Sequence, residues 1–139
     1  MAVALEPDRV LFSEFMEVLP TAGAVRLLRD RGLPPYWRQE WIEPLYRFAE
    51  DWHDAEREFL DPELETVRSD LLAGVDELLN YIGWNTFVVL GDRQGIPPEW
   101  EYEQLDRALE VTNELVRLGD GVVQAHQTLI RLARRRLAL

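Results

Sequence analysis

The chain has 139 residues, 47% hydrophobic and 29% charged, which is enough to bury a core and typical of globular proteins. It contains no cysteine, which excludes disulfides, thiolate metal sites and cysteine nucleophiles. A formal net charge of −11 disfavours nucleic acid and favours basic partners. The N-terminus lacks the pattern of a secretion signal and no apolar run is long enough to span a membrane. We expect one cytoplasmic domain over residues 1–139.

The first third of the chain shows two helical patterns. Pro7 suits a first helical position, and apolar residues with helical spacing follow it as far as Pro20. Thr21 is a candidate N-cap for a short second helix. Gly32 suits the left-handed position that ends such a helix.

The clearest helical pattern follows Pro34 and Pro35. Its large apolar side chains recur every three or four residues and predict one helical stripe that packs in the core, rather than an aromatic ligand site: Trp37, Trp41, Leu45, Phe48, Trp52, Ala55 and Phe59. Pro44 lies inside the stripe. Because proline removes a backbone donor and clashes with the preceding turn, it should kink the helix or mark a restart.

Asp61 and Pro62 predict the N-cap and first position of the next helix. The segment 81–90 is ambiguous, because Phe87, Val88 and Val89 have strand propensity. A single short strand would have no partner, so we extend the helix to Leu90 and leave the strand open as an alternative. A loop over 91–98 then leads to a last helix over 101–136, weakened at its centre by two glycines. The expected fold is all-α, a four- to five-helix antiparallel bundle.

One phrase occurs twice. The pattern G-[L/I]-P-P-x-W-x-x-E fits residues 32–40 and 95–103, an offset of 95 − 32 = 63 residues. Either the bundle consists of two related helix-connector-helix halves, or the same connector arose twice, since glycine ends a helix and the prolines prevent its continuation. Both interpretations stay open.

The chain has two histidines, His53 and His126. His126 falls in register with the core stripe of the last helix, which favours a hydrogen-bonded core residue. Glu50 and His53 form an E-x-x-H element, which places both on one helical face as in di-iron bundles. A second such element is missing, because Val123 stands three residues before His126. Glu50 and His53 therefore give half of a metal site, or else a solvated acidic face.

Arg47 and His53 also carry a family resemblance. An arginine followed four to six residues later by a histidine, in a helical background, is similar to the motif of the HEPN ribonucleases, small all-α proteins that usually dimerise. The resemblance implies that Arg47 and His53 would bind and cleave an RNA backbone. The acidic residues around His53 disfavour RNA.

The segment Glu99, Trp100, Glu101 and Tyr102 is acidic and aromatic, which is typical of a protein contact surface. The alternative is that Trp100 closes the end of the bundle. Arginines at the end of the last helix complement its dipole, or dock on the acidic 50–65 segment of a second copy to form a homodimer.

No catalytic triad, zinc spacing or phosphate-binding loop is present in the sequence. The sequence therefore favours a bacterial cytoplasmic interaction protein over an enzyme, of the inhibitor, immunity or adaptor type, with a basic protein partner and no cofactor. A small ribonuclease using Arg47 and His53, or a metal-binding bundle using Glu50 and His53, is the alternative.

Overall fold

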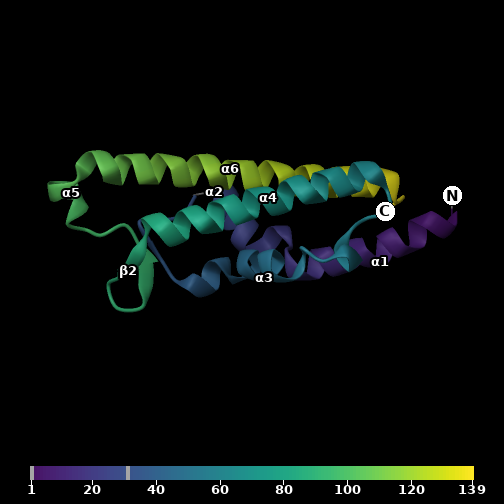
Figure 1. Cartoon of the computed structure of the whole chain (residues 1–139), viewed down its shortest axis with the longest axis horizontal. Coiled ribbons are helices and arrows are strands. Elements are labelled where there is room, and N and C mark those ends of the chain that lie inside the picture. Colours follow the sequence, from purple (N-terminus) through teal and green to yellow (C-terminus); the bar gives the residue numbers. More distant parts are fainter. Residues whose placement is uncertain (1, 31) are drawn as a thin grey trace.

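The computed structural model describes residues 2–30 and 32–139, and most of them are helical (Figure 1). The α-helices in this part of the chain are α1 (Ala2–Val18), α2 (Arg26–Asp30), α3 (Glu43–Asp51), α4 (Pro62–Asn85), α5 (Trp100–Glu103) and α6 (Leu105–Arg136). Three short strands, β1 (Tyr36–Trp37), β2 (Phe87–Val89) and β3 (Arg93–Gly95), form a small sheet. Short helical turns cover Gln39–Ile42 and Ala55–Arg57, and the backbone kinks within Thr21–Val25, where Ala22 and Gly23 have non-helical dihedral angles. The prediction of an all-α helical bundle is confirmed.

The long helices α4 and α6 run side by side in opposite directions, and α1 and α3 lie along the other side of α4 (Figure 1). The start of α1 and the C-terminus lie at one end of the molecule, whereas the strand β2 and α5 lie at the other. The core fills the space between these helices with residues at helical spacing, such as Leu71, Val75, Leu78 and Ile82 of α4. No helix in the described part of the chain is both long and apolar enough to cross a membrane.

Two helix starts follow the sequence signals. The Asp61 carboxylate accepts hydrogen bonds from the amides of Glu63 and Leu64 at 2.9 and 3.3 Å, so Asp61 caps α4 as expected. Pro44 lies in the first turn of α3, directly after the turn Gln39–Ile42, and therefore marks a restart.

The central glycines of the last helix do not interrupt it. α6 is continuous through Gly119 and Gly121, and a Cβ on Gly119 would lie 3.3 Å from Leu28 Cδ2. The absence of a side chain thus lets α2 pack closely on α6, which offsets the lower helix propensity of glycine.

The stripe from Trp37 to Phe59 does not belong to one helix. It is divided among β1, two short turns, α3 and the segment before α4, although most of its large side chains are buried as predicted. Trp41 is the exception among them, with 40% of its surface exposed.

The extension of the helix to Leu90 is wrong. α4 ends at Asn85, and β2 pairs antiparallel with β3, with Val89 opposite Arg93. The sequence argues against a strand because no partner strand is apparent. β3 is that partner, and it lies within the segment predicted as a loop. β3 pairs in turn with β1, where Tyr36 is opposite Gly95.

The two copies of the repeated phrase therefore touch at the sheet. The amide of Ile96 donates to the Pro35 carbonyl at 3.3 Å. Their backbones differ, because Gly32 has a φ of +66° whereas Gly95 lies in β3. Several positions related by the offset are buried in both copies: Leu45 and Ala108, Phe48 and Val111, Trp52 and Leu115, and Phe59 and Val122. Duplication of the halves and the independent origin of one connector both stay open.

Polar contacts join α1 and α6 to the start of α4 at the end of the molecule where the C-terminus lies. The buried Asp8 carboxylate accepts from the amides of Leu60 and Asp61 at 2.8 and 2.9 Å, which joins α1 to the start of α4. The Arg136 guanidinium donates to the Asp61 carboxylate at 2.8 Å, which joins α6 to the same point. Burial raises the pKa of Asp61, but the hydrogen bonds from Arg136 and from backbone amides outweigh burial and lower it.

Candidate functional site

The residues proposed for a metal site lie apart from any cluster of ligands. His53 follows the end of α3, and its Nε2 lies 3.0 Å from Asp76 Oδ2 of α4. Glu50 is exposed on α3. In the described residues, no group of three or more histidine and carboxylate side chains stands close enough together to hold a metal ion. The metal-bundle alternative therefore has a histidine and a carboxylate in contact, but not the set of ligands it needs.

The two residues of the HEPN-like motif have separate partners. Arg47 Nε lies 3.8 Å from Glu43 Oε1 on the same face of α3, and its side chain is 68% exposed. His53 is held instead against α4 by Asp76. Among the described residues, no hydrogen bond or ion pair joins Arg47 to His53. The ribonuclease alternative stays a prediction.

His126 is a fully buried core residue, as the sequence predicts. Its Nε2 lies 2.7 Å from the Leu19 carbonyl, which can only accept, so Nε2 carries the proton. Nδ1 lies 3.0 Å from Gln127 Nε2 and accepts from it. Burial lowers the pKa of His126, and the hydrogen bond to Leu19 only partly opposes this effect. The histidine is therefore a neutral structural group.

The acidic aromatic segment lies at the far end of the bundle, where α5 leads into α6 (Figure 1). Trp100 is only 6% exposed and packs edge-on against Phe87, with ring centroids 5.9 Å apart. Tyr102 is 89% exposed, and Glu99 and Glu101 are exposed as well. Trp100 thus closes the bundle end, which is the alternative left open above. Within this segment, Tyr102 is the aromatic side chain available for contact.

Further apolar side chains are exposed at this same end. We call the following set the hairpin end surface: the apolar residues Trp84, Phe87, Val88, Leu90 and Tyr102, and the carboxylates Glu99, Glu101 and Glu103. The exposed fraction is 82% for Trp84 and 75% for Val88, so these side chains are almost free of contacts within the chain. They come from the end of α4, from the hairpin formed by β2 and β3, and from α5.

A shallow depression runs across the hairpin end surface. It has a volume of about 350 Å³ and lies between β2 and the start of α6, with Trp100 among its lining residues. The Arg107 guanidinium lies over the Trp100 ring, 4.2 Å from the ring centroid. Arg107 thus shields one face of the indole and braces α5 against α6.

The carboxylates of the hairpin end surface have no cationic partners among the residues that the structure describes. Among the described residues, Glu99, Glu101 and Glu103 form no ion pair, and the nearby Arg107 is directed at Trp100. The surface is therefore apolar and negatively charged, which electrostatically suits a cationic partner.

The C-terminal arginines divide into two groups. Arg136 is paired with Asp61 of its own chain. Arg131, Arg134 and Arg135 line an open depression on the surface of α6. The acidic segment that was proposed to receive the arginines of a second copy thus already receives Arg136 of the same chain, which agrees with a role for this arginine in stabilising the fold.

The acidic part of the hairpin end surface can be recognised from the sequence, but its apolar part was missed. The signal is present in Phe87, Val88 and Leu90, an apolar run that the sequence places in an extension of the preceding helix. Comparison of the chain with known protein families, with curated proteins and with solved structures finds no match.

Proposed function

We propose that the protein acts by binding a basic protein partner through the hairpin end surface, as an adaptor or an inhibitor. One observation carries this proposal: large apolar side chains are exposed together at one end of the bundle, and the neighbouring carboxylates have no ionic partner in the described part of the chain. Contiguous exposed apolar residues rimmed by polar ones are typical of protein interaction sites.

The aromatic side chains give the surface its capacity for binding energy. Tyr102 and Trp84 are among the residue types that dominate measured interfaces, because each buries a large rigid area at low entropic cost. Both lie almost free of intramolecular contacts, so nearly their whole area is available to a partner. Removing one such anchor from an interface commonly costs about 2 kcal/mol, or about thirtyfold in affinity.

The charge of the surface selects the partner class. Since Glu99, Glu101 and Glu103 pair with no cation of the described residues, an approaching acidic or phosphate-rich surface is repelled, whereas a lysine- or arginine-rich protein surface is attracted. The net charge of −11 extends the same attraction over a longer range and raises the rate of encounter.

The backbone at Leu90 supports a role in binding rather than in stability. Leu90 has a φ of +45°, a left-handed conformation that costs a residue with a Cβ about 1 kcal/mol, and its side chain is 61% exposed. An asparagine or glycine would fit this turn better. A leucine that is both strained and exposed contributes little to the stability of the fold, so we assign its side chain to the contact with the partner.

The test is capture of the partner from the native host by the tagged protein, followed by mass spectrometry. The proposal expects a stoichiometric protein of basic composition. Capture should be lost when Tyr102→Ala is combined with Glu99→Lys and Glu101→Lys, because these changes remove the anchor and reverse the local charge.

The matched control carries Glu17→Lys and Glu50→Lys, which change the net charge equally but lie on α1 and α3, outside the surface. Both residues are exposed. If the control loses the partner as fully as the surface variant does, binding follows the net charge and the proposed surface is wrong. Retention of the partner by the surface variant would also refute the proposal.

A further inference from the structure

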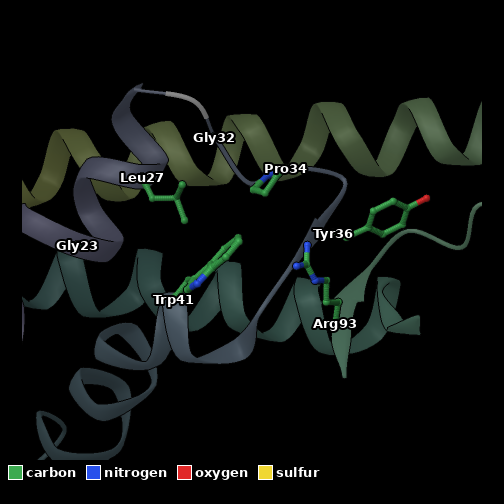
Figure 2. A pocket seen from close by; sticks show the side chains of 7 residues that line it. All are labelled: Gly23, Leu27, Gly32, Pro34, Tyr36, Trp41 and Arg93. Carbon is green, nitrogen blue, oxygen red and sulfur yellow. The ribbon is translucent and has the colours of Figure 1, made fainter. Parts of the chain in front are cut away.

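A separate cavity lies outside the hairpin end surface and shares no lining residue with it. It has a volume of about 630 Å³, and Figure 2 shows its lining residues: Gly23, Leu27, Gly32, Pro34, Tyr36, Trp41 and Arg93. These residues come from the turn before α2, from α2, from the segment that leads into β1, from the turn before α3, and from β3. The volume lies within the range of about 300–1,000 Å³ that is usual for small-molecule sites.

The walls of the cavity are mainly apolar. Figure 2 shows the Trp41 ring and the Leu27 side chain extending toward one another from opposite sides. Trp41 is 40% exposed although its neighbours in the stripe, Trp37 and Leu45, are fully buried. The exposed part of this indole is a flat surface on which a planar ring can stack.

Two glycines keep part of the wall free of side chains. Gly23 and Gly32 have φ values of +101° and +66°, where an L-residue with a side chain is strained. A Cβ at Gly23 would meet no atom within 4 Å, so there is room at this position, and the backbone conformation is what favours glycine. The conformation of the turn therefore preserves the opening.

The cavity also contains a cation, the guanidinium of Arg93. Figure 2 shows the Arg93 guanidinium extending from β3 toward the space beside Trp41, with the Tyr36 ring on its other side. The Arg93 side chain has no hydrogen bond or ion pair with any described residue. A guanidinium at the edge of an apolar cavity offers a planar pair of donors to a carboxylate.

We propose that this cavity binds a small planar aromatic molecule that carries one carboxylate. The ring stacks on Trp41 between Leu27 and Pro34, and the carboxylate accepts hydrogen bonds from Arg93. This proposal does not depend on the proposed partner binding, because none of the lining residues belongs to the hairpin end surface.

The test uses defined probes: benzoate, indole-3-acetate and 2-naphthoate, each paired with its neutral amide. Binding is followed on the full chain by NMR titration of the tryptophan indole N–H signals, with the Trp41 signal assigned from Trp41→Phe. We expect at least one carboxylate to shift the Trp41 signal and to bind about tenfold or more tightly than its amide. If no carboxylate in the panel shifts this signal at millimolar concentration, the proposal is wrong.

Two pairs of variants locate the site. Arg93→Gln should weaken binding of the carboxylate about tenfold and leave the amide unchanged, whereas Arg131→Gln should change neither. Trp41→Ala should weaken both probes, whereas Trp84→Ala, which removes a tryptophan that is 82% exposed on α4, should weaken neither.

Other outcomes would overturn the proposal. Sensitivity to Arg131→Gln or Trp84→Ala, with no effect of Arg93→Gln, would place the probe on the C-terminal arginines or the hairpin end surface. An equal loss of carboxylate and amide binding in Arg93→Gln would show that the arginine shapes the cavity and does not bind the anion. Circular dichroism of each variant confirms that the helical fold is intact before the titrations are compared.

Discussion

Gly95→Ala tests the contact between the two copies of the repeated phrase. A Cβ built on Gly95 would lie 2.1 Å from the Pro35 carbonyl oxygen and 3.1 Å from Tyr36 Cδ1. Contacts between carbon and oxygen are normally no shorter than about 3.3 Å, so β1 must move away by roughly 1 Å. This movement breaks the hydrogen bond from the Ile96 amide to Pro35, which measures 3.3 Å.

The expected destabilisation is about 2–4 kcal/mol. Overpacking costs about 1–3 kcal/mol, and the lost hydrogen bond adds about 1 kcal/mol. The free energy of unfolding is measured by urea denaturation, followed by far-ultraviolet circular dichroism. Gly121→Ala is the matched control, because a Cβ there meets no atom within 4 Å inside α6. The control should gain about 0.5–1 kcal/mol, since alanine favours a helix over glycine.

The test depends on whether Gly95→Ala and Gly121→Ala raise or lower the free energy of unfolding. If Gly95→Ala is as stable as the parent while Gly121→Ala gains stability, β1 and β3 do not approach as closely as the structure places them. The close contact of Gly95 with Pro35 would then be refuted, whereas the helical bundle would be unaffected.

Four further substitutions give separate checks. Leu90→Asn should raise the free energy of unfolding by about 1 kcal/mol by relieving the left-handed strain, and should weaken partner capture. Trp100→Ala should lower it by about 3 kcal/mol, because this indole is buried. Asp8→Ala should lower it by about 2–4 kcal/mol in the same urea assay, since two backbone amides lose their acceptor. Burial lowers the pKa of His126 in the folded state below 6.5. As the pH falls below 6.5, the unfolded state therefore takes up this proton first, and the free energy of unfolding decreases until the pH reaches the lower pKa of the folded state. His126→Gln should flatten the decline in the free energy of unfolding below pH 6.5.

The helices could be predicted from the sequence because their signals are local. Asp61 and Pro62 specify the start of α4 through a cap and a fixed φ, and both are adjacent in the chain. Pro44 specifies a restart in the same way. The buried residues of α4 and α6 follow a period that a single helix displays in full, so the core faces could be assigned without knowledge of the fold.

The sheet could not be predicted because its determinants are distant in the chain. Tyr36 pairs with Gly95, and neither strand is long enough to display an alternating pattern. A run such as Phe87 to Val89 is equally compatible with a buried helix, and only the partner strand decides between them. The same limit explains Trp100, whose burial depends on Phe87 and Arg107 and not on its acidic neighbours.

The hairpin connects the two proposed sites without merging them. β2 presents Phe87 and Val88 on the hairpin end surface, whereas β3 carries Arg93 into the cavity. Since Val89 pairs with Arg93, a substitution that separates the strands should disturb both sites, but a side-chain change on one strand should disturb only one. Arg93→Gln should therefore abolish the preference for a carboxylate and leave partner capture intact. Val88→Asp should abolish partner capture and leave the preference for a carboxylate intact, because it places a charge in the apolar surface without altering the pairing of β3. Loss of both activities in either variant would mean that the hairpin, rather than its two faces, is the functional unit.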